Sequence, residues 1–199
     1  DASAKVGLAT GSGNPREYLL RFMKNHPVAS KKLRKSSITS LSLHPIPLGG
    51  PVTKTYSNGL LVVGDSASQV KPTTGGGVIV GLTCSKIAGE VAYEAVKNND
   101  FSETFLSRYQ SRWKELTGFD LAVMRQIRKL LNHLSDDRID KIVDLCEKLG
   151  VDNVLEEVGD LDFQGRSLIP MIKHPTALVV MLYFIYSWLT SSSIRSCPK

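Results

Sequence analysis

A glycine-rich loop between an apolar run and a helical pattern constrains this chain more than any other feature. Residues 60–63 form a continuous apolar run, Leu-Leu-Val-Val, which predicts a β-strand buried on both faces. Gly64 and Asp65 end the run, and residues 66–77 are polar and rich in Gly and Thr. Helical periodicity then extends from 78 to 96. This order places Asp65 and the loop at the carboxyl end of a strand, where sheets of this kind bind ligands.

The residue types in this loop predict the chemistry of its ligand. The carboxylate of Asp65 can accept hydrogen bonds from the hydroxyls of a sugar or polyol. The first turn of the following helix has unpaired backbone N–H groups, and its dipole favours an anion by ~0.3–1 kcal/mol. Residues 75–77 are all glycine, so no Cβ keeps a flat ligand away from the backbone amides, and Pro72 stiffens the loop. We therefore expect a ligand that carries a polyol, phosphate and a planar ring that becomes negatively charged.

Two stretches of the chain carry a family resemblance. Residues 62–77 read Val-Val-Gly-Asp-Ser-Ala-Ser-Gln-Val-Lys-Pro-Thr-Thr-Gly-Gly-Gly, and residues 46–50 read Ile-Pro-Leu-Gly-Gly. Both resemble the geranylgeranyl reductase family, whose second FAD-binding motif is a Gly-Asp-Ala-Ala-like turn followed by Pro-x-Thr-Gly-Gly-Gly. Ser66 stands in place of the first alanine. The family consists of flavoproteins of the p-hydroxybenzoate hydroxylase-like superfamily, and its archaeal members saturate the isoprenoid chains of ether lipids.

The resemblance implies FAD as the cofactor and assigns residues to it. The cofactor-binding residues would be Gly64, Asp65, Pro72, Thr73, Thr74, Gly75, Gly76, Gly77 and Val78. The Asp65 carboxylate would bind the ribityl hydroxyls, and the loop amides would face the N1/O2 edge of the isoalloxazine, where reduction leaves negative charge. The implied reaction is hydride transfer to C=C bonds of geranylgeranyl or polyprenyl chains in lipid biosynthesis. Candidate substrate residues are Pro47, Gly49, Gly50 and Trp113. No side chain is placed by the sequence as the proton donor, so no catalytic residue is assigned.

The expected fold class is α+β. It combines part of a p-hydroxybenzoate hydroxylase-like FAD/NAD(P)-binding fold, with few strands and the second FAD motif, and an all-helical C-terminal region. We divide the chain into a substrate or sheet domain with a basic loop, the second FAD motif, and the helical region, at residues 1–57, 58–100 and 101–199. Further strands are expected at 4–9 and 38–43. Helices are expected from the capping box Asn14–Glu17, over 102–134 with a kink near Gly118, and at 135–150, 153–158, 166–173 and 176–190.

The first FAD motif of the family is missing from this chain. Such flavoproteins hold the ADP half of FAD with a strand and a Gly-x-Gly-x-x-Gly turn. Gly11-Ser12-Gly13 lacks both the preceding buried strand and the third glycine. We therefore expect the chain to be a fragment, the C-terminal portion of a longer reductase whose N-terminal remainder is its partner.

Basic residues are concentrated near the start of the chain. The formal net charge is +6, and residues 1–54 contain nine basic residues against two acidic ones. The run from Lys31 to Lys35 would attract anionic lipid headgroups or an acidic partner such as a ferredoxin; NAD(P)H is the other candidate electron donor. Nucleic acid is disfavoured, because no aromatic residue interleaves the run.

The expected location is the cytoplasm, with peripheral membrane contact through an apolar C-terminal helix. No signal peptide is visible. The apolar stretch 177–189 spans only ~20 Å as a helix, against a hydrocarbon core of ~30 Å. It would be a core helix, the wall of a substrate tunnel, or a helix resting on a membrane surface.

The three cysteines are far apart and predict neither a disulfide framework nor a metal site. Cys84 and Cys146 are expected in the core and Cys197 in a free tail. Two alternative functions stay open at this point. The chain could belong to another flavoprotein of the same superfamily, a monooxygenase or halogenase, or it could be a non-catalytic module that binds lipid or a membrane.

Overall fold

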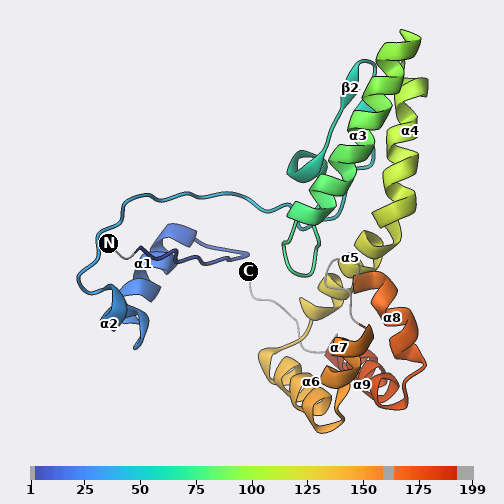
Figure 1. The fold of residues 1–199 in the computed structure, drawn as a ribbon. Coiled ribbons are helices and arrows are strands. Elements are labelled where there is room, and N and C mark those ends of the chain that lie inside the picture. Colours follow the sequence, from blue (N-terminus) through green and yellow to red (C-terminus); the bar gives the residue numbers. More distant parts are fainter. Residues whose placement is uncertain (1–2, 159–163, 192–199) are drawn as a thin grey trace. The chain divides into compact units, whose positions relative to one another are not determined.

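The structure, a computed structural model, describes residues 3–158 and 164–191 (Figure 1). It divides into two compact units, Asp1–Pro45 and Ile46–Lys199. The division that the sequence placed after residue 57 stays a prediction. Cys197 lies outside the described residues.

The first unit contains the helices α1 (Pro15–Asn25) and α2 (Ala29–Leu33), which contact each other. The helix α1 begins at the predicted capping box. The side chain of Asn14 accepts hydrogen bonds from the backbone N–H groups of Arg16 (3.0 Å) and Glu17 (3.4 Å) and donates to the Glu17 carboxylate (3.1 Å). This reciprocal cap confirms the predicted start of the helix.

The strands predicted at residues 4–9 and 38–43 are wrong for this structure. Neither segment belongs to a strand, and the side chains of Ile38 and Leu43 are each 55% exposed. Alternating apolar residues do not make a strand by themselves, because a strand also needs a neighbour to complete its hydrogen-bond ladder. The described part of the first unit provides no such neighbour.

The second unit opens with a short antiparallel hairpin of β1 (Tyr56–Ser57) and β2 (Leu60–Leu61). Asn58 and Gly59 form the turn that connects the strands, and Gly59 takes the left-handed conformation with φ +67°. The strand predicted over 60–63 is shorter than expected and is not buried on both faces, since Leu60 is 52% exposed. A single hairpin neighbour cannot cover both faces of a strand, which explains the difference.

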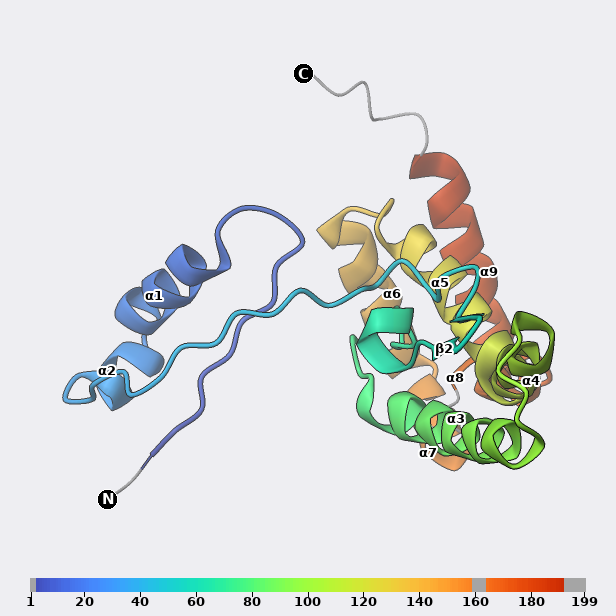
Figure 2. The same ribbon diagram turned by 90° about the horizontal axis from the view of Figure 1, so that it is seen from above.

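The helices α3 (Val78–Asn98) and α4 (Glu103–Trp113) form a hairpin around the first core cluster (Figures 1 and 2). Asn99 ends α3 in the left-handed conformation, and the Ser102 hydroxyl caps α4 by accepting a bond from the Phe105 N–H (3.2 Å). The cluster consists of Val80, Cys84, Ile87, Ala88, Val91, Ala95, Phe105, Leu106, Tyr109, Trp113 and Leu121.

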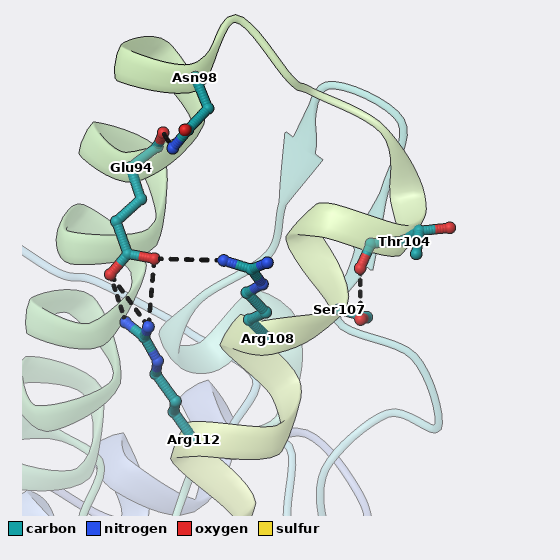
Figure 3. Close-up of polar contacts among 6 residues, drawn as sticks. All are labelled: Glu94, Asn98, Thr104, Ser107, Arg108 and Arg112. Carbon is teal, nitrogen blue, oxygen red and sulfur yellow. Dashed lines mark hydrogen bonds and ion pairs between the residues drawn. The ribbon is translucent and has the colours of Figure 1, made fainter.

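A charged contact also joins these two helices (Figure 3). Both carboxylate oxygens of Glu94 on α3 face the guanidinium of Arg112 on α4, with bonds of 2.9, 3.0 and 3.1 Å. Arg108, one turn earlier on α4, lies 3.8 Å from the same carboxylate. The hydrogen bond from Arg112 lowers the pKa of Glu94 from its ordinary value.

The helix predicted over 102–134 continues without a loop through a π-helical turn near its centre. The turn Lys114–Gly118 separates α4 from α5 (Phe119–Leu131). The Thr117 hydroxyl donates to the Trp113 carbonyl (3.0 Å) there. This confirms a break near Gly118, and its physical form is one extra residue in the turn.

The remaining helices pack around a second cluster. They are α6 (Asp136–Lys148), α7 (Val151–Val158), α8 (Gln164–Ile172) and α9 (Pro175–Ser191), and all four were predicted. Gly150 follows α6 with φ +63°, as expected of its position after the helix. Cys146, which was expected in the core, is half-buried beside the cluster, and Val143 on the same helix is 59% exposed. Buried Asp120 on α5 accepts a bond from the Arg166 N–H (2.8 Å) and so fixes the start of α8.

The described chain is therefore largely helical with few strands, as expected of the helical region. Of the described helices, none alone is long and apolar enough to span a membrane. The segments Gly165–Ile172 and Pro175–Ser191 together meet that requirement of length and composition, but they are bent by 115° at their junction.

Candidate functional site

The structure brings Asp65 to the first turn of α3. Residues Gly64–Ala67 form a 3₁₀ turn, which Gly64 enters with φ +68°. The loop backbone returns so closely that a methyl group added to Gly77 would lie 3.1 Å from Asp65 Oδ1 and 3.2 Å from Val70 Cγ2. The carboxylate of Asp65 thus lies beside a backbone position that has no room for a side chain.

The loop that precedes α3 is closed by its own backbone. The Lys71 N–H donates to the Gly76 carbonyl and the Gly75 N–H donates to the Lys71 carbonyl, both at 2.9 Å. Gly75 has φ +75°, which only glycine adopts readily. The side chain of Lys71 crosses Gly76, because a methyl group there would lie 2.8 Å from Lys71 Cε. A cationic side chain therefore lies over the middle glycine of the triplet.

Two contacts hold this loop from outside. Arg128 on α5 donates from Nη1 to the carbonyl of buried Pro72 (3.1 Å). A methyl group on Gly75 would touch Ile46 (3.5 Å) and Leu48 (3.8 Å), so the Ile46–Gly50 stretch packs beside the loop. Thr73 is half-buried, whereas Thr74 and Val78 are exposed, Val78 by 75%.

Sequence reasoning missed the residues that hold the Gly64–Ala67 turn. Gln69 is fully buried, and its Oε1 accepts from the Gly64 N–H (2.8 Å). Its Nε2 donates to the Tyr109 hydroxyl (2.9 Å), which donates in turn to the Val62 carbonyl (3.0 Å). Burial raises the pKa of Tyr109 to about 12, so this hydroxyl remains a donor at neutral pH. A glutamine among the small residues of the motif was the one signal available in the sequence.

Cys84 lies two helical turns beyond the loop, on the core face of α3. It is fully buried, and burial raises the pKa of its thiol to about 11. A thiol with that pKa is protonated at neutral pH and is a poor nucleophile. The structure therefore supports the prediction that Cys84 is a small core residue.

An open groove of about 350 Å³ lies beside α5 and is separate from the glycine loop. Its lining is mostly uncharged and comprises Pro51, Val52, Thr53, Trp113, Lys114, Gly118, Leu121, Ala122 and Arg125. Gly50 packs against the side chain of Arg125 at its edge, since a methyl group on Gly50 would lie 2.9 Å from Arg125 Cδ. Of the predicted substrate residues, Trp113 lines the groove and Gly50 borders it, whereas Pro47 and Gly49 do not line it.

Comparison with known proteins decides the relationship. No protein-family model matches this sequence. The chain is 41% identical over 150 residues to digeranylgeranylglycerophospholipid reductase of Methanocaldococcus jannaschii, covering 74% of the chain and 37% of that protein. It is 35% identical over 153 residues to digeranylgeranylglycerophospholipid reductase 2 of Methanopyrus kandleri, covering 74% and 39%.

The chain is a homologue of the geranylgeranyl reductases. A solved structure agrees with this. The crystal structure of a geranylgeranyl bacteriochlorophyll reductase-like protein from Thermoplasma acidophilum matches with a TM-score of 0.60 and 25% identity, over 85% of this chain and 40% of that one. The resemblance predicted from the loop motif is thereby confirmed. This geranylgeranyl reductase homologue spans about two fifths of the length of the curated relatives.

Among the described residues of the reductase homologue, no three His, Cys, Asp or Glu side chains gather as a metal site would require. The polar groups that the structure does gather are Asp65, the loop amides and Lys71, at one end of α3. A carboxylate and a cation suit a ligand with hydroxyls and a negatively charged ring, whereas the N–H groups of Gly75 and Gly76 already donate to partners within the loop.

Proposed function

We propose that this chain is the C-terminal portion of an FAD-dependent reductase that hydrogenates C=C bonds of geranylgeranyl or polyprenyl chains in lipid biosynthesis. The observation that carries the proposal is the position of the Asp65 carboxylate beside Gly77 at the first turn of α3, in a homologue of the geranylgeranyl reductases.

The residues present fit one face of FAD. A methyl group at Gly77 would lie 3.1 Å from Asp65 Oδ1, so only glycine lets the start of α3 pack this closely against the carboxylate that would hold the polyol hydroxyls. The residues that would hold FAD are Gly64, Asp65, Pro72, Thr73, Thr74, Gly75, Gly76, Gly77 and Val78. Bound FAD would supply the hydride for an alkene carbon.

The chain's own groups have separate tasks in this proposal. The Asp65 carboxylate accepts hydrogen bonds from polyol hydroxyls and orients them. The N–H groups at the start of α3 stabilise negative charge through the helix dipole, and the Lys71 ammonium adds a positive charge over Gly76. The Gln69–Tyr109 pair keeps the turn that carries Asp65 in place.

The exposed apolar face of α3 is evidence for the proposed N-terminal remainder. Val78, Leu82, Tyr93 and Val96 are 63–75% exposed, although the opposite face of the same helix lies in the core. A helix that is apolar all round is usually buried on both sides. About three fifths of the relatives' length lies outside the matched region, and we propose that the corresponding part of this reductase covers this face.

The substrate and the electron donor follow as further parts of the proposal. The relatives' names identify a prenylated lipid as their substrate class, and we propose the same class here. The electron donor would be NAD(P)H or an acidic ferredoxin, and the exposed residues Lys31, Lys32 and Lys35 are suited to the latter. Exposed apolar residues on α9, including Leu182 and Leu189, favour peripheral membrane contact.

Replacing Asp65 tests the flavin site. In the full-length protein, Asp65→Ala should release FAD, because the acceptor for the polyol hydroxyls is lost, while Asp144→Ala on the exposed face of α6 should not. The measurement is the ratio of flavin absorbance to protein after purification. Stoichiometric flavin in the Asp65→Ala protein would refute the role given to Asp65.

A further inference from the structure

The groove beside α5 combines an apolar floor with two cations at its rim. Trp113 and Leu121, each 1% exposed, close the floor from the core side, and the exposed side chains of Val52 and Ala122 supply the apolar surface. Lys114 and Arg125 are exposed, and no Asp or Glu is among the lining residues. The groove therefore offers positive charge and apolar surface to the same ligand.

Both cations are available for a ligand. Within residues 3–158 and 164–191, neither Lys114 nor Arg125 forms an ion pair with a carboxylate. The Lys114 ammonium lies 5.9 Å from the centre of the Trp113 ring, over the floor of the groove. A guanidinium binds phosphate oxygens in a two-pronged geometry, and an ammonium adds a point charge.

The groove is built rather than incidental to the surface. Trp113 Nε1 donates to the Thr55 hydroxyl (3.0 Å), which fixes the indole. Gly50 has φ +89° and no Cβ, and the stem of Arg125 occupies the space that a side chain at Gly50 would need. The position of Arg125 thus depends on the Gly-Gly stretch that the sequence had marked for substrate.

The same helix links the groove to the glycine loop. Arg128 lies three residues beyond Arg125 on α5 and donates to the Pro72 carbonyl (3.1 Å). A ligand anchored at Arg125 would consequently lie on the scaffold that holds the proposed flavin loop.

We propose that this groove binds the phosphate-bearing end of the prenylated substrate, with Arg125 and Lys114 on the phosphate and the adjoining apolar part against Val52 and Ala122. This inference rests on the proposed function for the identity of the substrate. The ligand chemistry is a phosphate ester joined to an apolar chain. Arg125 and Lys114 are specificity-determining residues that act in binding and take no part in hydride transfer.

Calorimetric titration of the full-length protein without reductant tests the groove independently of activity. The probes are geranylgeranyl monophosphate, geranylgeraniol and inorganic phosphate. The monophosphate should bind at least about tenfold more tightly than either other probe, because only it uses both the cations and the floor. Equal affinity for the monophosphate and the alcohol, or for the monophosphate and inorganic phosphate, would overturn the proposal.

Matched variants locate the binding. Arg125→Gln and Lys114→Gln should each weaken monophosphate binding by about tenfold and leave geranylgeraniol binding unchanged. Arg125→Lys should restore part of the loss, and Lys129→Gln, exposed on the same helix outside the groove, should have no effect. Equal losses for all the variants, or for both ligands, would show that the phosphate is not held here.

Turnover separates this inference from the proposed function. With a prenylated phospholipid, Arg125→Gln should raise KM and leave kcat unchanged, since a group that binds ground state and transition state alike affects KM alone. Hydrogenation with an unchanged KM would refute the groove and leave the proposed function intact. Phosphate-dependent binding in a protein that hydrogenates no prenyl chain would refute the proposed function and leave the groove intact.

Discussion

Tyr109 connects the packing of the helices to the geometry of the candidate site. Its ring lies in the α3–α4 core, and its hydroxyl joins the Gln69 side chain to the Val62 carbonyl at the edge of the turn that carries Asp65. Phe105, Tyr109 and Trp113 follow one another at intervals of four residues, which is helical spacing and places all three rings in this core. The role of its hydroxyl as a bridge depends on where residues 62 and 69 lie in space, which helical periodicity does not predict.

Removing this hydroxyl should destabilise the protein. In the full-length protein, Tyr109→Phe leaves the Gln69 amide and the Val62 carbonyl without their buried partner, at a cost of ~1–3 kcal/mol. The free energy of unfolding in urea measures the loss. Tyr93→Phe is the matched control, since Tyr93 is 69% exposed. Indistinguishable stabilities for the two variants would contradict the bridging role.

At the scale of elements, the helices of the second unit were predicted well and the strands poorly. Helices satisfy their own backbone hydrogen bonds, so caps such as Ser102 and helix ends such as Gly150 are local signals. A strand depends on a neighbour that can lie anywhere in the chain. Residues 38–43 alternate correctly and still form no strand, because the described structure supplies no neighbour.

The Glu94–Arg112 contact gives the α3–α4 hairpin a dependence on pH. The pKa of Glu94 is lowered, so its contribution to stability is present above the unfolded-state value of about 4.3 and is lost as the pH falls through the lower folded-state value. Glu94→Gln should therefore lower the unfolding temperature at about pH 7 and make little difference well below about pH 4. Thermal unfolding at both values checks this, with Glu90→Gln as the exposed control on α3. A difference that persists in acid would argue against the ion pair.

At the scale of the whole molecule, the exposed apolar face of α3 predicts that another part of the full-length protein covers it. In the full-length protein with native cysteines replaced, Leu82→Cys and Val96→Cys should react with a maleimide about tenfold more slowly than Lys148→Cys, which is exposed on α6. Labelling rates followed by mass spectrometry measure the protection. Equal rates at all three positions would show that the N-terminal remainder does not cover this face. Protection lost on dilution would assign the cover to a second copy of the protein.

The sequence by itself determined the glycine loop, the helix that follows it and the helical C-terminal region, because turn glycines, caps and helical periodicity act over a few residues. It also determined the relationship to the geranylgeranyl reductases, through a motif of adjacent residues. Tertiary structure alone decided that Gln69 and Tyr109 hold the turn, that Lys71 crosses Gly76, and that Arg125 joins Trp113 in one groove. Each of these depends on contacts between backbone segments far apart in the chain or on the direction of a side chain. The spacing of residues along a short stretch of sequence predicts neither of the two.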